Sequence, residues 1–259
     1  MKDKLSIVKI GGNVVNSNPE LHAFLQDFAA LEGFRILVHG GGRIASDMAE
    51  SLGVETKMAG GRRITDEKTL DVVTMVYAGL LNKKIVSGLQ SKGCNAIGMS
   101  GADGNSIRAH KRPVEDLDYG FAGDVDEVDS RLITSLLRSG LVPVFCSITH
   151  DRLGQLLNTN ADTIAGELAK ALSREFDVEL IYCFEKKGVL RNVEDGSSVI
   201  ESINRERYED LKKNGSIAEG MLPKLHNCFE ALKNGVSRVI IGSPELLKDP
   251  ELIHTTLTL

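Results

Sequence analysis

Hydrophobic residues in this chain gather in short continuous runs, separated by longer segments in which they recur every three or four positions. The short runs are rich in β-branched residues and show little alternation of apolar and polar positions, which is typical of strands buried on both faces. We predict strands at residues 5–10, 35–39, 95–100, 141–148, 179–184 and 238–241.

The segments between these runs have the spacing of amphipathic helices. The first ends at Gly33, a suitable residue for a helix C-cap, and carries apolar side chains at Leu21, Phe24, Leu25, Phe28 and Leu31. Further helices are predicted at residues 44–52, 66–90, 130–138, 161–173, 204–213 and 221–233. Because strand and helix alternate along the whole chain, we expect an α/β fold, a three-layer αβα sandwich with a central, mainly parallel sheet.

Domain organisation, charge and cysteine content narrow the class of protein. We expect one domain over residues 1–259, because the chain has no repeat or low-complexity linker and its nearest seam is the charged stretch 173–177. A net charge of −5, aromatic residues at 5% and no Trp argue against nucleic acid binding. The N-terminus lacks the pattern of a signal peptide and no window resembles a membrane span, so we expect a cytoplasmic protein. Its cysteines form no CxxC pair and are expected in the core: Cys94, Cys146, Cys183 and Cys228.

Two glycine-rich segments follow predicted strands, where ligands bind in open α/β sheets. Segment 9–13 (KIGGN) joins a lysine to two glycines, and segment 39–43 (HGGGR) places three glycines before a helix. Glycines let backbone N–H groups approach an anion, and the positive end of a helix adds to the attraction. Either segment could instead be a simple turn, although three successive glycines exceed what a turn needs.

The second glycine segment also allows a different class of enzyme. Gly40, Gly42 and Ala45 satisfy the dinucleotide fingerprint G-x-G-x-x-A, and Glu55 follows at a distance that could suit a ribose contact. An NAD-dependent oxidoreductase is therefore an alternative, but it leaves Lys9 without a role.

Two later segments add polar groups. Segment 158–162 (NTNAD) could merely cap a helix, or its two amides and carboxylate could bind substrate and orient cations. Segment 215–224 (GSIAEGMLPK) puts Lys224 in the first turns of a helix, which is unfavourable unless an anion is bound. Two anion sites, two lysines and one aspartate between them form a set that suits phosphoryl transfer.

Six motifs together resemble, in order and spacing, the acetylglutamate kinases of the amino acid kinase family. The resemblance spans nearly the whole chain and rests on segments 9–13, 38–42, 61–65, 98–103, 157–162 and 220–224. It implies ATP-dependent phosphorylation of the γ-carboxylate of an N-acyl-L-glutamate, most simply N-acetyl-L-glutamate, to an acyl phosphate in arginine biosynthesis. A kinase for N-succinyl-glutamate or carrier-bound aminoadipate is the nearest alternative, and a regulatory module such as that of acetylglutamate synthases is another.

The resemblance also implies roles for individual residues. Lys9 and Lys224 would stabilise the transferring phosphoryl group, and Asp162 would orient both lysines. Gly11, Gly12 and Gly41 would bind phosphate. The acylglutamate would be bound by Gly41, Gly42, Arg63, Asn158 and Asn160; Arg63 matches rather than Arg62, because it directly precedes Ile64 and Thr65.

The nucleotide and the assembly are expected as follows. ATP, with Mg²⁺ bridging its phosphates and no protein ligand set for the metal, would contact Glu185, Lys186, Lys187, Gly188, Val189, Leu190, Ser216, Ile217 and Ala218. The loop at 184–188 departs from the family, which usually has Thr-Asp or Ser-Asp there.

Residues 1–177 would form an acylglutamate-binding and dimerisation lobe, and residues 178–259 a nucleotide-binding lobe. We expect a homodimer that pairs through the apolar helix at 66–90.

Overall fold

A computed structural model describes residues 2–192, 194–214 and 221–259. Within these residues the main sheet has eight strands, all parallel to their neighbours except at the β13–β14 pair. Their order is β12 (Ser202–Ile203), β14 (Thr255–Leu257), β13 (Arg238–Gly242), β11 (Asp177–Cys183), β1 (Lys4–Ile10), β2 (Phe34–His39), β8 (Val142–Phe145) and β5 (Ala96–Met99). The prediction of a mainly parallel central sheet is confirmed.

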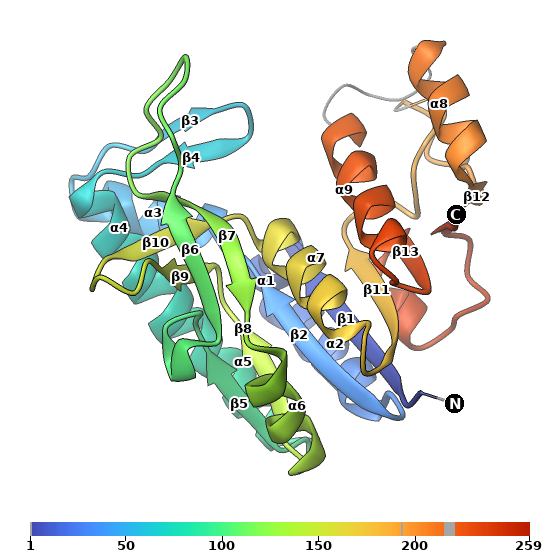
Figure 1. Ribbon diagram of the computed structural model, residues 1–259, viewed down its shortest axis with the longest axis horizontal. Helices are drawn as coiled ribbons and strands as arrows, with labels where there is room; N and C mark the ends of the chain where they lie inside the picture. The colour runs from blue at the N-terminus through green and yellow to red at the C-terminus, as the bar shows by residue number, and fades with distance from the viewer. Residues whose placement is uncertain (1, 193, 215–220) are drawn as a thin grey trace.

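Helices cover both faces of this sheet (Figure 1). One hydrophobic core includes side chains of α6 (Ser130–Arg138), α7 (Ala161–Leu172), α8 (Arg205–Lys213) and α9 (Leu222–Lys233). The core on the opposite face includes side chains of α1 (Gly12–Asn16), α2 (Asn18–Ala30), α3 (Gly42–Ser51), α4 (Glu67–Thr74), η1 (Met75–Leu81) and α5 (Asn82–Gln90). The fold is therefore the predicted three-layer αβα sandwich.

Strand β1 shows why the apolar runs were continuous. Leu5 and Ile7 are buried in the core beneath α7 and α9, whereas Val8 and Ile10 are buried in the core beneath α2. A strand covered by helices on both sides needs apolar residues at odd and even positions alike. Lys9 has the parity of Leu5 and Ile7, so it is directed to the face that α7 covers.

The predicted strand at 141–148 is wrong as a single element. The chain leaves the main sheet after Phe145 and enters a second, small sheet as β9 (Ile148–His150). This closed sheet also contains β10 (Leu156–Thr159), β7 (Ala122–Val128) and β6 (Ile107–Lys111), which the sequence did not predict. Strands such as β7, with sequence AGDVDEV, have too many polar residues to form an apolar run.

The helix predicted at 66–90 is present but is not uniformly α-helical. It consists of α4, a π-helical stretch η1 and α5, which follow one another without a break. A π-helical turn differs from an α-helical turn by one residue, and π-turns often occur at functional sites. Hydrophobic spacing alone does not reveal such an insertion.

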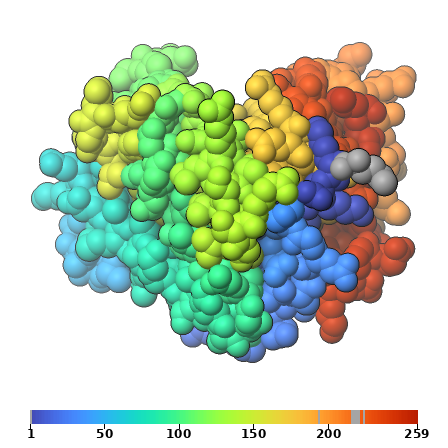
Figure 2. Space-filling model, turned by 60° about the horizontal axis from the view of Figure 1, so that its bottom comes forward, coloured from blue at the N-terminus to red at the C-terminus, as the bar shows by residue number. Residues whose placement is uncertain are grey.

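The seam predicted at 173–177 lies where β11 joins the sheet. β11 pairs with β1 over seven residues, from Lys4↔Asp177 to Ile10↔Cys183, so the sheet continues across the seam. In the space-filling view the last third of the chain, orange to red, nevertheless occupies one side of the molecule (Figure 2). The two predicted lobes are thus neighbouring parts of one continuous sheet.

The cysteines agree with a further expectation. Cys94, Cys146, Cys183 and Cys228 are free and buried, as core residues should be. None of the helices in the described part of the chain has the length and apolarity that crossing a bilayer requires.

Candidate active site

Three charged side chains from distant parts of the chain meet at the carboxyl end of β1. Lys9 Nζ lies 2.7 Å from Asp162 Oδ1, and Lys224 Nζ lies 3.3 Å from Asp162 Oδ2. All three side chains are mostly buried, with exposed fractions of 15%, 20% and 26% for Lys9, Asp162 and Lys224. One carboxylate therefore holds two ammonium groups side by side, as predicted from the sequence.

The position of Asp162 depends on the start of α7. Asn160 caps this helix, since its Oδ1 accepts hydrogen bonds from the N–H groups of Asp162 (2.8 Å) and Thr163 (3.2 Å). Tyr182, which pairs in register with Lys9, donates from its hydroxyl to the Asp162 carbonyl at 3.2 Å. Cap and tyrosine together fix the first turn of α7 against β1 and β11.

The ionisation of Asp162 follows from these contacts. Burial by itself disfavours the carboxylate, but the charges of Lys9 and Lys224 outweigh burial, and the pKa of Asp162 is lowered. The N-terminal end of α7 is also a favourable place for a negative charge. Asp162 is thus a carboxylate at neutral pH and pairs with both lysines.

The two glycine segments border a cavity of about 230 Å³ beside this triad. Gly41 has φ +154°, and a Cβ there would lie 2.2 Å from Leu81 Cδ1, so glycine is required for close packing on η1. The N–H of Gly11 is already engaged within the protein, because it donates to the Cys183 carbonyl at 3.1 Å. The predicted residues that line the cavity are Lys9, Gly12, Gly41, Gly42, Arg63, Asn158, Asn160 and Asp162.

Arg63 is 7% exposed and lies at the wall of the cavity. Its Nη2 donates to the Gly42 carbonyl and to Ser46 Oγ, both at 2.8 Å, and its Nη1 donates to Thr56 Oγ1 at 3.1 Å. The guanidinium therefore holds Gly42 and Ser46, in the first turns of α3, close to Thr56. The sequence motif identified Arg63 but gave no sign of Ser46 and Thr56, which are single hydroxyls without a pattern.

Asn158 also lines this cavity. Its Nδ2 donates to Thr65 Oγ1 at 3.0 Å, and Thr65 follows the hairpin that carries Arg63. Asn160 serves as the cap of α7, so the helix-cap interpretation of this segment is confirmed for its oxygen, while its binding role stays a prediction.

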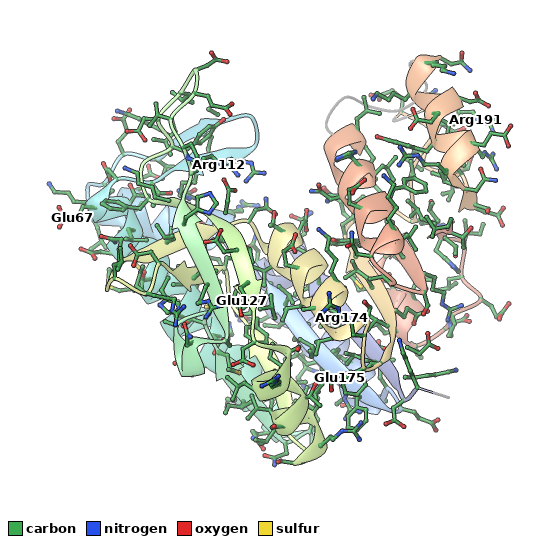
Figure 3. The ribbon with its side chains drawn as sticks, viewed as in Figure 1. Glu67, Arg112, Glu127, Arg174, Glu175 and Arg191 are labelled. Atoms are coloured by element: carbon green, nitrogen blue, oxygen red, sulfur yellow. The ribbon has the colours of Figure 1, made fainter. Side chains whose placement is uncertain are left out.

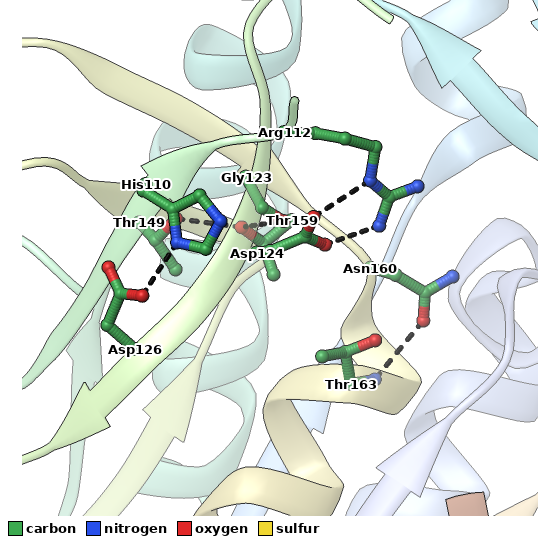
Figure 4. Close-up of polar contacts among 9 residues, drawn as sticks. All are labelled: His110, Arg112, Gly123, Asp124, Asp126, Thr149, Thr159, Asn160 and Thr163. Atoms are coloured by element: carbon green, nitrogen blue, oxygen red, sulfur yellow. Dashed lines mark hydrogen bonds and ion pairs between the residues drawn. The ribbon is translucent and has the colours of Figure 1, made fainter. Parts of the chain in front are cut away.

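Two further arginines, Arg62 and Arg112, lie near one another close to this cavity. Strands β3 (Lys57–Ala59) and β4 (Arg62–Ile64) form a hairpin. Arg62 of this hairpin also lines the cavity, although the sequence motif had selected Arg63 instead. Burial and the nearby charge of Arg112 lower the pKa of Arg62. Arg112 lies beside this hairpin (Figure 3) and pairs with Asp124, its Nε at 2.9 Å from Oδ2 (Figure 4).

The predicted nucleotide loop after β11 has two distinct halves. Glu185, Lys186 and Lys187 are exposed, and Glu185 Oε2 accepts a hydrogen bond from Asn13 Nδ2 at 2.6 Å. Gly188, Val189 and Leu190 are buried, and the Val189 N–H donates to Thr255 Oγ1 at 2.8 Å. These three residues therefore offer little side-chain surface to a nucleotide. Ser216, Ile217 and Ala218 lie outside the described residues.

This arrangement suits an anion flanked by positive charge. Lys9 lines the cavity beside the glycines at 40–42, Lys224 pairs with the other oxygen of the Asp162 carboxylate, and no cluster of three or more His, Cys, Asp or Glu side chains able to hold a metal occurs in the part of the chain that the structure describes. Preorganised donors of this kind stabilise charge that spreads over a transferring group.

Comparison with known proteins decides the family. The model of the amino acid kinase family matches residues 4–243, which is most of the chain. The chain belongs to the amino acid kinase family. It is 55% identical over 251 residues to an acetylglutamate kinase of Bacteroides thetaiotaomicron, covering 97% of this chain and 98% of that protein. It is 57% identical over 241 residues to the acetylglutamate kinase of a Bacteroides fragilis strain, covering 93% and 92%.

Solved structures agree with this family assignment at the level of the fold. The N-acetylglutamate synthase of Neisseria gonorrhoeae superposes with a TM-score of 0.82 at 20% identity, over 99% of this chain and 59% of that protein. The oxidoreductase alternative is not favoured in an amino acid kinase. Glu55, which would contact the ribose of a dinucleotide, is exposed and pairs with Lys57 at 3.1 Å.

Proposed function

We propose that this amino acid kinase transfers the γ-phosphoryl group of ATP to the γ-carboxylate of N-acetyl-L-glutamate. The observation that carries the proposal is the Lys9–Asp162–Lys224 triad, of which Lys9 and Asp162 line the same cavity as Gly12 and the glycines at 40–42. Full-length relatives at 55% and 57% identity with the name acetylglutamate kinase support the choice of substrate.

The chemistry needs positioning and positive charge rather than a base. A carboxylate nucleophile is already ionised at neutral pH, so no side chain has to remove a proton. Its oxygen attacks the γ-phosphorus, the bond from phosphorus to the β–γ bridging oxygen breaks, and ADP leaves. Lys9 and Lys224 stabilise the negative charge on the phosphoryl oxygens, and Asp162 keeps both ammonium groups in place.

The acylglutamate and the phosphoryl group share the cavity in this proposal. Gly12 and Gly41 donate backbone N–H groups to phosphate, with Gly11 shaping the turn between β1 and α1. Gly41, Gly42, Arg63, Asn158 and Asn160 hold the acylated amino acid, and Arg63 is the cation for its α-carboxylate. The lobe at residues 1–177 thus binds the acylglutamate.

The nucleotide is assigned to the lobe at residues 178–259. ATP enters as its Mg²⁺ complex, with the metal held by phosphate oxygens, and contacts the segments 185–190 and 216–218. Lys186 and Lys187 are exposed cations at the end of β11, which supports this placement. Magnesium is therefore part of the substrate, the Mg²⁺ complex of ATP.

The assembly is proposed from the surface of η1. Met75 and Leu80 are 54% and 51% exposed although both are large and apolar. A two-fold pairing of this helix with a second copy would remove them from water. We propose a homodimer that works in the cytoplasm.

Acyl phosphate trapping tests the proposed reaction. ATP, Mg²⁺ and hydroxylamine are incubated with the enzyme and with N-acetyl-, N-succinyl- or free glutamate, and hydroxamate is measured. We expect the highest kcat/KM with N-acetyl-L-glutamate and almost no product from free glutamate. Preference for N-succinyl-glutamate would move the proposal to that substrate, and absence of hydroxamate with all three would contradict it.

A further inference from the structure

A buried histidine lies directly behind the second glycine segment. His39, the last residue of β2, is fully buried, and its Nδ1 lies 2.9 Å from the carbonyl oxygen of Gly40. Its Nε2 lies 3.2 Å from Asn82 Nδ2, at the start of α5. The Ser147 hydroxyl donates to the His39 carbonyl at 3.1 Å. The ring is thus enclosed on both of its nitrogens.

The partners of Asn82 decide which nitrogen of His39 carries the proton. Asn82 Nδ2 is 2.9 Å from the Val144 carbonyl, which can only accept, and Asn82 Oδ1 is 3.0 Å from Lys83 Nζ, which can only donate. The amide orientation is therefore fixed, and its N–H₂ group also faces His39 Nε2. Nε2 must accept, so the proton is on Nδ1 and is donated to Gly40.

The charge state of the ring follows from its surroundings. Burial lowers the pKa of His39 to about 4, against a smaller opposite effect of the Gly40 hydrogen bond, and the positive charge of Lys83 lowers it further. Among the described residues, Lys83 is the charged group that acts on this ring. His39 is thus neutral over the physiological pH range, with a single tautomer.

The bond to Gly40 has a consequence on the opposite side of the peptide. In a planar trans peptide, the C=O of one residue and the N–H of the next point in opposite directions. Because the Gly40 carbonyl is directed to the buried His39, the Gly41 N–H is directed away from it. Gly40 and Gly41 both line the cavity, so this N–H becomes a fixed donor for an anion there.

The π-helical stretch η1 and its surroundings keep this arrangement in place. Leu81 and Tyr77 of η1 pack against Gly41, where a Cβ would clash. Asn82 follows directly, and a Cβ on Gly98 would lie 1.9 Å from its Oδ1. η1 and the residue that follows it thus bring two packing side chains to Gly41 and one hydrogen-bonding amide to His39.

We propose that His39 is a positioning residue whose tautomer, set by Asn82, directs the Gly41 N–H into the cavity as an anion donor. The inference rests on the proposed function for the identity of the anion, a phosphoryl or carboxylate oxygen of the reacting substrates. Neither His39 nor Asn82 contacts substrate in this scheme. The geometry of the peptide between Gly40 and Gly41 transmits their effect.

The tautomer is tested without turnover by ¹⁵N NMR of the histidine ring in the full-length wild-type protein. We expect a neutral His39 with its proton on Nδ1 and no titration between about pH 5.5 and 9. A proton on Nε2, or titration near the usual histidine pKa of about 6.5, overturns the inference. This result does not depend on which acylated amino acid is the substrate, so it is independent of a failure of the proposed function.

Substitution of Asn82 gives a readout that a purely structural role would not change. In Asn82→Asp the carboxylate accepts from Nε2–H and raises the pKa of His39, so the ring donates to Gly40 only while it is doubly protonated. We expect the ratio of variant to wild-type kcat to fall at least tenfold as the pH rises from about 6 to 9. A constant ratio overturns the inference.

Two further variants separate positioning from folding. His39→Leu removes the donor and should lower kcat at least tenfold. His39→Asn keeps an N–H donor on an atom bonded to Cγ, as Nδ1 is in histidine, and should recover part of that loss. Leu89→Ala, at a fully buried site of α5, is the control. It should lower Tm while leaving the His39 tautomer and the pH profile as in the wild type. Equal losses of kcat in His39→Leu and His39→Asn contradict the proposal.

Discussion

Lys9 Nζ lies 2.7 Å from Asp162 Oδ1, which connects the carboxyl end of β1 to the first turn of α7. An ion pair this well buried could serve stability alone or could hold a cation for catalysis. The presence of Lys224 on the other oxygen of the same carboxylate favours the second role, because two lysines are brought together despite their repulsion. Kinetics and unfolding of variants at these residues distinguish a role in stability from a role in catalysis.

Removal of either lysine should affect turnover more than folding. For Lys9→Ala and Lys224→Ala we expect kcat to fall about a hundred- to thousandfold, equivalent to roughly 3–4 kcal/mol, since each loses a preorganised donor. Steady-state kinetics and thermal unfolding of the same preparations check this. Lys170→Ala, which removes a partner of Glu167 on the surface of α7, is the control and should keep wild-type kcat. Normal kcat in a destabilised Lys9→Ala protein would contradict the phosphoryl role.

Asp162→Asn should also be nearly inactive, because both ammonium groups lose the carboxylate that holds them. Its stability relative to the wild type should depend on pH. The pKa of Asp162 is lowered in the folded state, so the carboxylate contributes stability above its unfolded pKa of about 3.9. That contribution is lost as the pH falls through the lower, folded pKa. Chemical denaturation of both proteins from about pH 7 to 2 should show the difference in unfolding free energy shrinking with acidification.

Arg63→Lys should weaken binding of the acylglutamate selectively. Lysine cannot reproduce the planar guanidinium that clamps Gly42 and Ser46, so we expect KM for N-acetyl-L-glutamate to rise at least tenfold with little change in KM for ATP. Arg174→Lys, on the exposed surface after α7, is the matched control. Equal effects on the two substrates would contradict the assignment. Arg62→Lys is a useful third variant because Arg62 also lines the cavity.

The proposed dimer predicts a mass of two 28.1 kDa chains by analytical ultracentrifugation. Leu80→Glu places a charge on the exposed apolar side of η1 and should shift the equilibrium to monomers, because an unpaired buried charge is costly. The exposed Leu153, far along the chain in the loop before β10, provides the control variant Leu153→Glu. A wild-type mass of one chain or of six would refute the prediction.

The layers of the fold could be predicted from the pattern of apolar residues. Largely apolar runs such as that of β1 are typical of strands covered on both faces, so the pattern indicated a buried parallel sheet before any contact was known. The glycine segments and Lys9, Asp162 and Lys224 were also predictable, because glycine and charge at strand and helix ends are local features with a chemical reason. The second sheet was not predicted, since its strands are short and partly polar.

How these local features are combined depends on contacts between elements that are distant in the sequence. The tautomer of His39 depends on Asn82 and Val144, and the orientation of Arg63 depends on Ser46 and Thr56; these partners come from separate elements and leave no pattern in the sequence. The π-helical turn at η1 likewise depends on packing rather than on residue spacing. Periodicity records which face of an element is buried, whereas the direction of each polar group is set by the neighbours that the fold brings to it.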